Sequence, residues 1–88
     1  MNKPHVSKRK WEKEIRPTLA AKNIDARERE KIESYLWACF DRDPGDDTAG
    51  INEEEISEVI EYMRKHMDEH HIAESKIVIL EALLKKYL

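Results

Sequence analysis

The chain has 88 residues, of which 40% are charged, while only two are glycine and three are proline. This length and composition predict one helical domain, and the single cysteine, Cys39, excludes an internal disulfide. No apolar run reaches the roughly 20 residues of a membrane span, and no apolar segment follows the basic start as in a secretion signal, so a cytoplasmic protein is expected.

Charge is distributed unevenly along the chain. Residues 1–22 contain seven Lys/Arg and two Glu, whereas residues 41–61 contain nine Asp/Glu and one Arg. This asymmetry predicts two surfaces of opposite charge, which either attract each other within the chain or bind separate partners.

The first predicted helix begins after Ser7, a residue type that caps helix N-termini. Its apolar residues Trp11, Ile15 and Leu19 recur at every fourth position, as on the buried face of a helix. Pro17 has no amide hydrogen, so we expect this helix to kink or restart at the preceding residue.

A second helix is predicted from Asp25, because Glu28 follows three residues later in a capping-box pattern. Its apolar face comprises Ile32, Leu36 and Phe40. An acidic segment then leads to the third predicted helix.

The third helix is predicted to begin at Asn52, again with an acid, Glu55, three residues later. Ile51 and Ile56 occupy the two positions of a hydrophobic staple around this start. The apolar stripe of the helix continues through Val59 or Ile60, Met63 and Met67.

After a break near residues 70–73, a last helix is predicted, and it is apolar on more than one face. Such a face is too broad for an ordinary surface helix, so the other helices must enclose it or another chain must contact it. The segment Lys76–Leu80 is rich in β-branched residues, but no second strand is available for it to pair with. The sequence therefore predicts an all-α, compact four-helix domain over residues 1–88, with no convincing strand.

The acidic segment carries the clearest chemical signal in the chain. Four aspartates lie within seven residues and a glutamate follows in the next helix: Asp41, Asp43, Asp46, Asp47 and Glu55. Crowded carboxylates repel one another, and a divalent cation relieves this repulsion; calcium takes six to eight oxygen ligands. The sequence therefore predicts a calcium site at these residues, although an ordinary Asp/Gly/Pro turn followed by a capping box accounts for them without metal.

Residues 32–67 resemble the EF-hand family of calcium-binding helix–loop–helix proteins. Phe40 followed by Asp41-Arg42-Asp43 resembles the end of the incoming helix and the first two ligand positions. Gly50-Ile51 resembles the turn glycine and the central hydrophobic residue, and Asn52 and Glu55 match the ninth-position residue and the bidentate glutamate.

The resemblance departs from the family in loop length. From Asp41 to Glu55 there are fifteen residues instead of twelve, which implies an insertion around Pro44-Gly45-Asp46 and leaves Asp46 and Asp47 as alternatives for the fifth position. EF-hands usually occur in pairs, but this chain has no second acidic loop. The resemblance therefore implies a solitary hand supported by the other helices or by a second copy of the chain.

Two weaker patterns in the sequence have simpler explanations. His66 and His70, four residues apart, are able to reach one zinc ion together with Glu69, His71 or Glu74, but such pairs are common on charged helices, so zinc is not expected. The basic run Lys8-Arg9-Lys10 suits phosphate contacts, but without an aromatic platform a solvated helix face is the simpler interpretation.

The favoured interpretation is a small calcium-responsive or calcium-stabilised protein–protein interaction module that is not an enzyme, because no catalytic constellation is present. Its partner, a protein or a second copy of the chain, is expected at an apolar groove near Trp37, Phe40, Met63 and Met67, with Leu80 and Leu84 of the last helix as further partner-binding residues. A metal-independent helical adaptor or dimerisation domain is the alternative, and weak nucleic-acid binding through the basic N-terminal helix is the second alternative.

Overall fold

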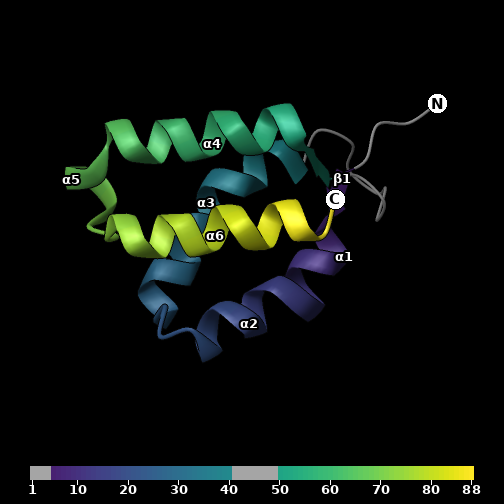
Figure 1. Ribbon diagram of the computed structural model, residues 1–88, viewed down its shortest axis with the longest axis horizontal. Coiled ribbons are helices and arrows are strands. Elements are labelled where there is room, and N and C mark those ends of the chain that lie inside the picture. Colours follow the sequence, from purple (N-terminus) through teal and green to yellow (C-terminus); the bar gives the residue numbers. More distant parts are fainter. Residues whose placement is uncertain (1–4, 41–49) are drawn as a thin grey trace.

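The structure, a computed structural model, describes the backbone of residues 5–40 and 50–88 and the side chains of these residues except 38–40. The described part is almost entirely helical, which confirms the all-α prediction (Figure 1). The elements in chain order are β1 (His5–Ser7), α1 (Lys8–Lys10), the π-helical turn η1 (Trp11–Ile15), α2 (Arg16–Ala21), α3 (Ala26–Phe40), β2 (Gly50–Asn52), α4 (Glu53–Lys65), α5 (Met67–His70) and α6 (Glu74–Lys86).

The helices form two layers around one core. In Figure 1, α4 and α6 run side by side and α3 crosses behind them, while the segment from α1 to α2 lies below α6. The C-terminus of the chain returns close to β1 in the same view.

The first helical segment starts after Ser7 and restarts at Arg16, as its sequence predicts. The Ser7 side chain accepts a hydrogen bond from the backbone N–H of Lys10 at 3.1 Å, and Pro17 lies in the first turn of α2. Before it, the Arg16 N–H donates to the carbonyl of Trp11, five residues back, as in a π-helical turn. A stripe at every fourth residue drifts around an α-helix of 3.6 residues per turn, and the wider π turn reduces this drift.

Reciprocal capping boxes define the starts of α3 and α4. The Asp25 carboxylate accepts from the Glu28 N–H at 2.8 Å, and the Glu28 carboxylate accepts from the Asp25 N–H at 3.1 Å. That Glu28 N–H lowers the pKa of Asp25 below its usual value near 3.8, so the stabilisation it gives is present above that pH and is lost as the pH falls further. Asn52 and Glu55 repeat the arrangement at 2.9 and 3.0 Å.

One feature differs from the sequence-based expectation of no strand. Strands β1 and β2 pair antiparallel, with His5 opposite Asn52, Val6 opposite Ile51 and Ser7 opposite Gly50. Val6 and Ile51 are both fully buried, so this pair closes one end of the core. The strands are short and far apart in the sequence, which leaves no local pattern that would reveal them.

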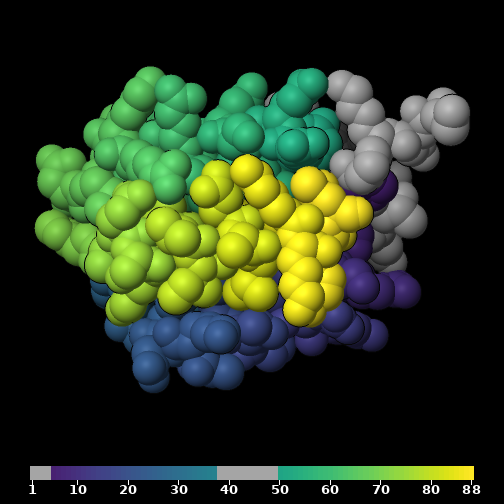
Figure 2. Space-filling model, in the orientation of Figure 1, coloured from purple at the N-terminus to yellow at the C-terminus, as the bar shows by residue number. Residues whose placement is uncertain are grey.

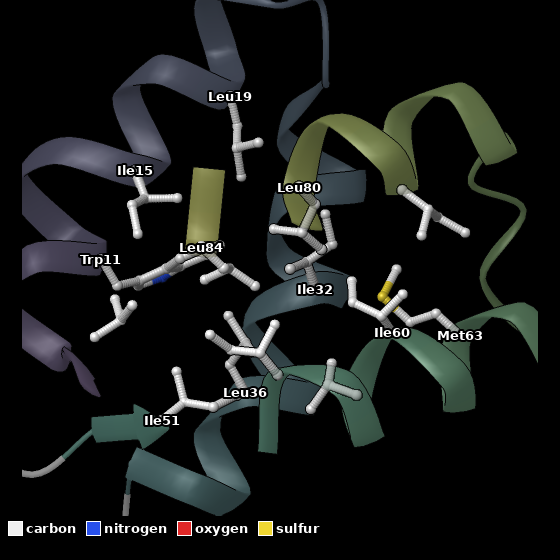
Figure 3. Close-up of a cluster of buried hydrophobic side chains, with 14 of the residues drawn as sticks. Trp11, Ile15, Leu19, Ile32, Leu36, Ile51, Ile60, Met63, Leu80 and Leu84 are labelled. Carbon is white, nitrogen blue, oxygen red and sulfur yellow. The ribbon is translucent and has the colours of Figure 1, made fainter. Parts of the chain in front are cut away.

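The core gathers most of the predicted apolar stripes (Figure 3). Trp11 lies beside Leu84 of α6, and Ile32 of α3 lies near Leu80 of α6. Connecting segments add apolar side chains that the helical stripes did not include: Val6, Ile24 and Ile72.

The last helix buries one face in the core and leaves the other on the surface. Ile77, Leu80 and Leu84 are completely buried, whereas Val78 is 50% exposed. Ile79 and Leu83 are half-buried against the core, and α6 runs across the middle of the face shown in Figure 2. The apolar character of α6 is therefore explained in part by packing within the chain.

A buried ion pair joins the N-terminal ends of α3 and α6. Glu28, whose side chain is 4% exposed, accepts two hydrogen bonds from the Lys76 ammonium at 2.8 and 3.0 Å. By contrast, the Glu61–Lys65 pair on α4 has both side chains more than 60% exposed. The first pair is shielded from water on its acidic side and the second is not.

Replacing Lys76 by methionine is expected to lower the free energy of unfolding by about 2 kcal/mol, because it leaves the Glu28 carboxylate buried without its cation. The estimate is below that for a fully buried pair because Lys76 itself is 31% exposed. Urea denaturation followed by circular dichroism measures the change. Lys65→Met is the matched control and should cost less than about 0.5 kcal/mol, and equal losses in the two variants would contradict the role of burial.

Candidate functional site

Most of the predicted calcium ligands lie outside the described residues. This applies to Asp41, Asp43, Asp46 and Asp47, which belong to residues 41–49. Glu55 is described, and its carboxylate accepts from the Asn52 N–H at 3.0 Å as part of the capping box of α4. Within residues 5–40 and 50–88, no group of three or more His, Cys, Asp or Glu side chains is arranged to hold a metal ion.

Described elements lie on either side of residues 41–49. Helix α3 ends at Phe40, and β2, which is paired with β1, begins at Gly50. Helix α4 begins directly after β2, and the packing of Ile51 and Ile56, both fully buried, fixes this start.

The predicted apolar partner groove is not present as a surface. Met63, Leu80 and Leu84 are completely buried inside the chain, so they belong to the core and are not available to a partner in this fold. An apolar stripe on a helix predicts burial but does not distinguish a core from an interface.

The other members of the predicted groove have different surroundings. Met67 is half-buried against the core, and so is Trp37, over whose ring the Lys8 ammonium lies at 4.3 Å. The side chain of Phe40 is outside the described part. The five residues whose side chains are described therefore do not form one continuous surface.

His66 and His70 do not form a pair. His70 is completely buried, its Nδ1 accepts from the Ile72 N–H at 2.9 Å, and its Nε2 lies 2.7 Å from the Met63 carbonyl oxygen. An Nδ1 that accepts leaves the ring proton on Nε2, which donates to that carbonyl. Both nitrogens of His70 are thus occupied, and this excludes it as a zinc ligand in this conformation.

The structure instead assembles an aromatic cluster on α3, α4 and α5. Tyr35 and Tyr62 meet edge to face with ring centroids 5.4 Å apart, and His66 packs against Tyr62 at 4.2 Å. Glu69 joins the two phenols, since it accepts from Tyr35 at 3.1 Å and from Tyr62 at 3.4 Å. Lys31 and His66 lie within 4.0 Å of the same carboxylate.

A groove runs along this cluster between α3 and α4. Its walls are mostly apolar, and its volume is about 320 Å³. The residues lining it are Ser34, Tyr35, Glu58, Val59 and Tyr62. Sequence analysis did not select Glu58 or Tyr62, although Tyr62, His66 and Glu69 recur at four- and three-residue intervals that mark one helical face.

Tyr35 is expected to ionise with a pKa of about 12, because burial disfavours the phenolate, and because the Glu69 carboxylate accepts a hydrogen bond from the phenol and repels negative charge. Since this pKa is raised from its usual value near 10, the stabilisation is complete below pH 10 and is lost as the pH rises towards 12. NMR titration of the Tyr35 ring carbons measures the pKa. Glu69→Gln should lower it towards 10, whereas Asp68→Asn, on an exposed neighbour, should leave it unchanged.

The basic N-terminal helix is partly engaged within the chain. Besides Lys8 on Trp37, the Lys10 ammonium lies 5.4 Å from the ring centroid of Tyr87. A shallow polar depression, lined by Lys8, Arg9, Glu12 and Lys13, contains an acid among its bases. Arg9, Glu12 and Lys13 are exposed, whereas Lys8 and Lys10 are half-buried, so only part of this helix face is solvated.

Comparisons with protein-family models, with curated proteins and with solved structures found no match to this chain. Among the described residues, no helix is long and apolar enough to cross a membrane.

Proposed function

We propose that this chain is a small helical protein-interaction module whose acidic loop binds a divalent cation, with calcium as the first candidate. The observation that carries the proposal is the anchoring of the loop exit by the β1–β2 pair, directly before α4. A cation that neutralises the loop carboxylates would therefore affect the start of α4, the helix that forms one wall of the aromatic groove. The single cysteine favours a cytoplasmic location for such a module.

The loop aspartates are the main proposed ligands of the calcium ion. Four carboxylates over Asp41–Asp47 supply the hard oxygen donors that calcium prefers. Glu55 serves the N-terminus of α4 through its capping box, so its contribution to the metal competes with its contribution to the helix. The EF-hand resemblance remains part of this proposal and supports calcium over zinc.

Isothermal titration of the full chain with calcium tests the metal part, with magnesium and zinc as comparisons. We expect binding in the micromolar to millimolar range, weakened at least tenfold by Asp43→Asn. Asp68→Asn removes the same charge from an exposed site on α5 and should leave the affinity unchanged. Absence of heat with millimolar calcium, while circular dichroism shows a folded protein, would sink the calcium proposal.

A metal-independent adaptor is the second candidate, and a specific observation favours it. The aromatic groove is built from Ser34, Tyr35, Glu58, Val59 and Tyr62, all outside the loop. Binding of a partner to these residues with EDTA present would support the adaptor, whereas binding that requires calcium would support the first candidate. Sedimentation of the chain at high concentration shows whether that partner is a second copy.

A further inference from the structure

The groove between α3 and α4 combines an apolar floor with exposed aromatic surface. Tyr62 is 43% exposed and is, with Val78, one of the large apolar residues that stand out on the described surface. Val59 lies beneath it and is 9% exposed, while the edge-to-face contact with Tyr35 holds the Tyr62 ring in place. A rigid aromatic side chain of this kind offers contact area at a small cost in conformational entropy.

An unpaired carboxylate stands at the rim of the same groove. Glu58 is exposed, and it forms no hydrogen bond or ion pair with the described part of the chain. Other acids nearby are engaged, since Glu61 pairs with Lys65 at 3.1 Å and Glu69 accepts from two tyrosines. Glu58 is therefore the carboxylate that the groove offers to a ligand.

Apolar floor and free carboxylate together define the chemistry of the occupant. A Lys or Arg side chain has an apolar stem that covers aromatic and aliphatic surface and a cationic head that needs an acid. The volume of about 320 Å³ is at the lower end of the range for small-molecule pockets, which suits one side chain. The Glu58 carboxylate disfavours a phosphate group at this rim, so nucleic acids and anionic lipid surfaces fit poorly.

We propose that this groove binds a basic peptide segment of a partner protein, with one Lys or Arg stem along Tyr62 and Val59 and its cation on Glu58. The inference deepens the proposed interaction role and rests on it, but it does not depend on the acidic loop or on calcium. The partner segment is expected to be helical or extended, with an apolar residue beside the anchoring cation.

NMR titration of the ¹⁵N-labelled full chain, in EDTA, with an acetylated and amidated twelve-residue Leu/Lys peptide tests the proposal. The peptide should shift the amides of Ser34, Tyr35, Glu58, Val59 and Tyr62. Glu58→Gln should weaken binding about fivefold, the upper range for an exposed charge pair. Tyr62→Ala should weaken it about tenfold, as for an aromatic anchor.

Glu61→Gln is the matched control, because it removes one charge from the same helix outside the groove, and it should change the affinity less than twofold. Equal losses of peptide affinity in Glu58→Gln and Glu61→Gln would show that the peptide is held only by general charge attraction, and this would overturn the proposal. Shifts confined to other surfaces, equal binding of a Leu/Glu peptide, or no binding would also overturn it. Because the titration contains EDTA, none of these outcomes depends on whether the loop binds calcium.

Discussion

Replacing His70 by phenylalanine is expected to lower the free energy of unfolding by about 3 kcal/mol, because two buried backbone groups lose their partner. The Ile72 N–H donates to Nδ1 at 2.9 Å, and Nε2 donates to the Met63 carbonyl at 2.7 Å. Both bonds lie where the chain reverses between α4 and α6, at a residue with no exposed surface. No water can replace a lost ring nitrogen without opening this turn.

Urea denaturation of two His70 variants and one control measures the contribution of each hydrogen bond. His70→Phe loses both, and His70→Asn keeps an acceptor near the Nδ1 position, so it should cost about half as much. His71→Asn is the control, because His71 is exposed with a φ of 53° and asparagine tolerates this left-handed conformation. Long-range ¹H–¹⁵N spectra should show the proton on Nε2, and a proton on Nδ1 would contradict the arrangement.

The role of His70 shows where sequence reasoning lacks information. Its spacing from His66 indicates a shared helical face, yet His66 packs on Tyr62 at the surface while His70 is enclosed. The separation arises because His66 lies at the break between α4 and α5, with a φ of −126° and a ψ of 40°, so the two histidines do not share one continuous helix. Which of several histidines fills the inside of a turn depends on tertiary packing and leaves no periodic signal.

Helix starts were predictable because the interactions that define them are local. Asp25 with Glu28 and Asn52 with Glu55 each form a complete capping box within four residues. The restart of the helix at Arg16 follows from the missing amide hydrogen of Pro17. Such features depend on neighbours in the chain and so appear directly in the sequence.

The candidate site was less predictable, because its parts come from different helices. Methionine and leucine stripes indicated Met63, Leu80 and Leu84 as apolar, but only the packing of α6 across the core shows that they are buried. Conversely, Tyr62 lies outside the core stripe of α4 and becomes a groove wall only when Tyr35 of α3 meets it. The sequence alone does not single out Glu58, because its position beside Tyr35 and Tyr62 depends on the packing of α3 against α4.

Gly50→Ala is expected to lower the free energy of unfolding by about 3 kcal/mol, the upper part of the range for overpacking, because its methyl group has no space. A Cβ at this position would collide with the backbone of Val6 and Ser7, and in particular with the Val6 carbonyl oxygen. Backbone atoms cannot rotate away as a side chain does, so the β1–β2 pair must separate. Detaching β1 exposes Val6, which is fully buried, and loses the strand hydrogen bonds.

Cross-strand NOEs between Val6 and Ile51, together with urea denaturation, measure this effect. Val6→Ala alone removes buried methyl groups, and Gly50→Ala should cost less in that background than in the wild type, because the two changes act on the same strand pair. Fully additive losses with intact NOEs would show that the chain accommodates the methyl group in another way. If the two strands separate, the acidic loop is no longer anchored before α4, so Gly50→Ala should also weaken any calcium binding measured by titration. Lys76→Met should not weaken calcium binding, because Lys76 pairs with Glu28 at the N-terminal end of α3, whereas the loop follows the C-terminal end of that helix.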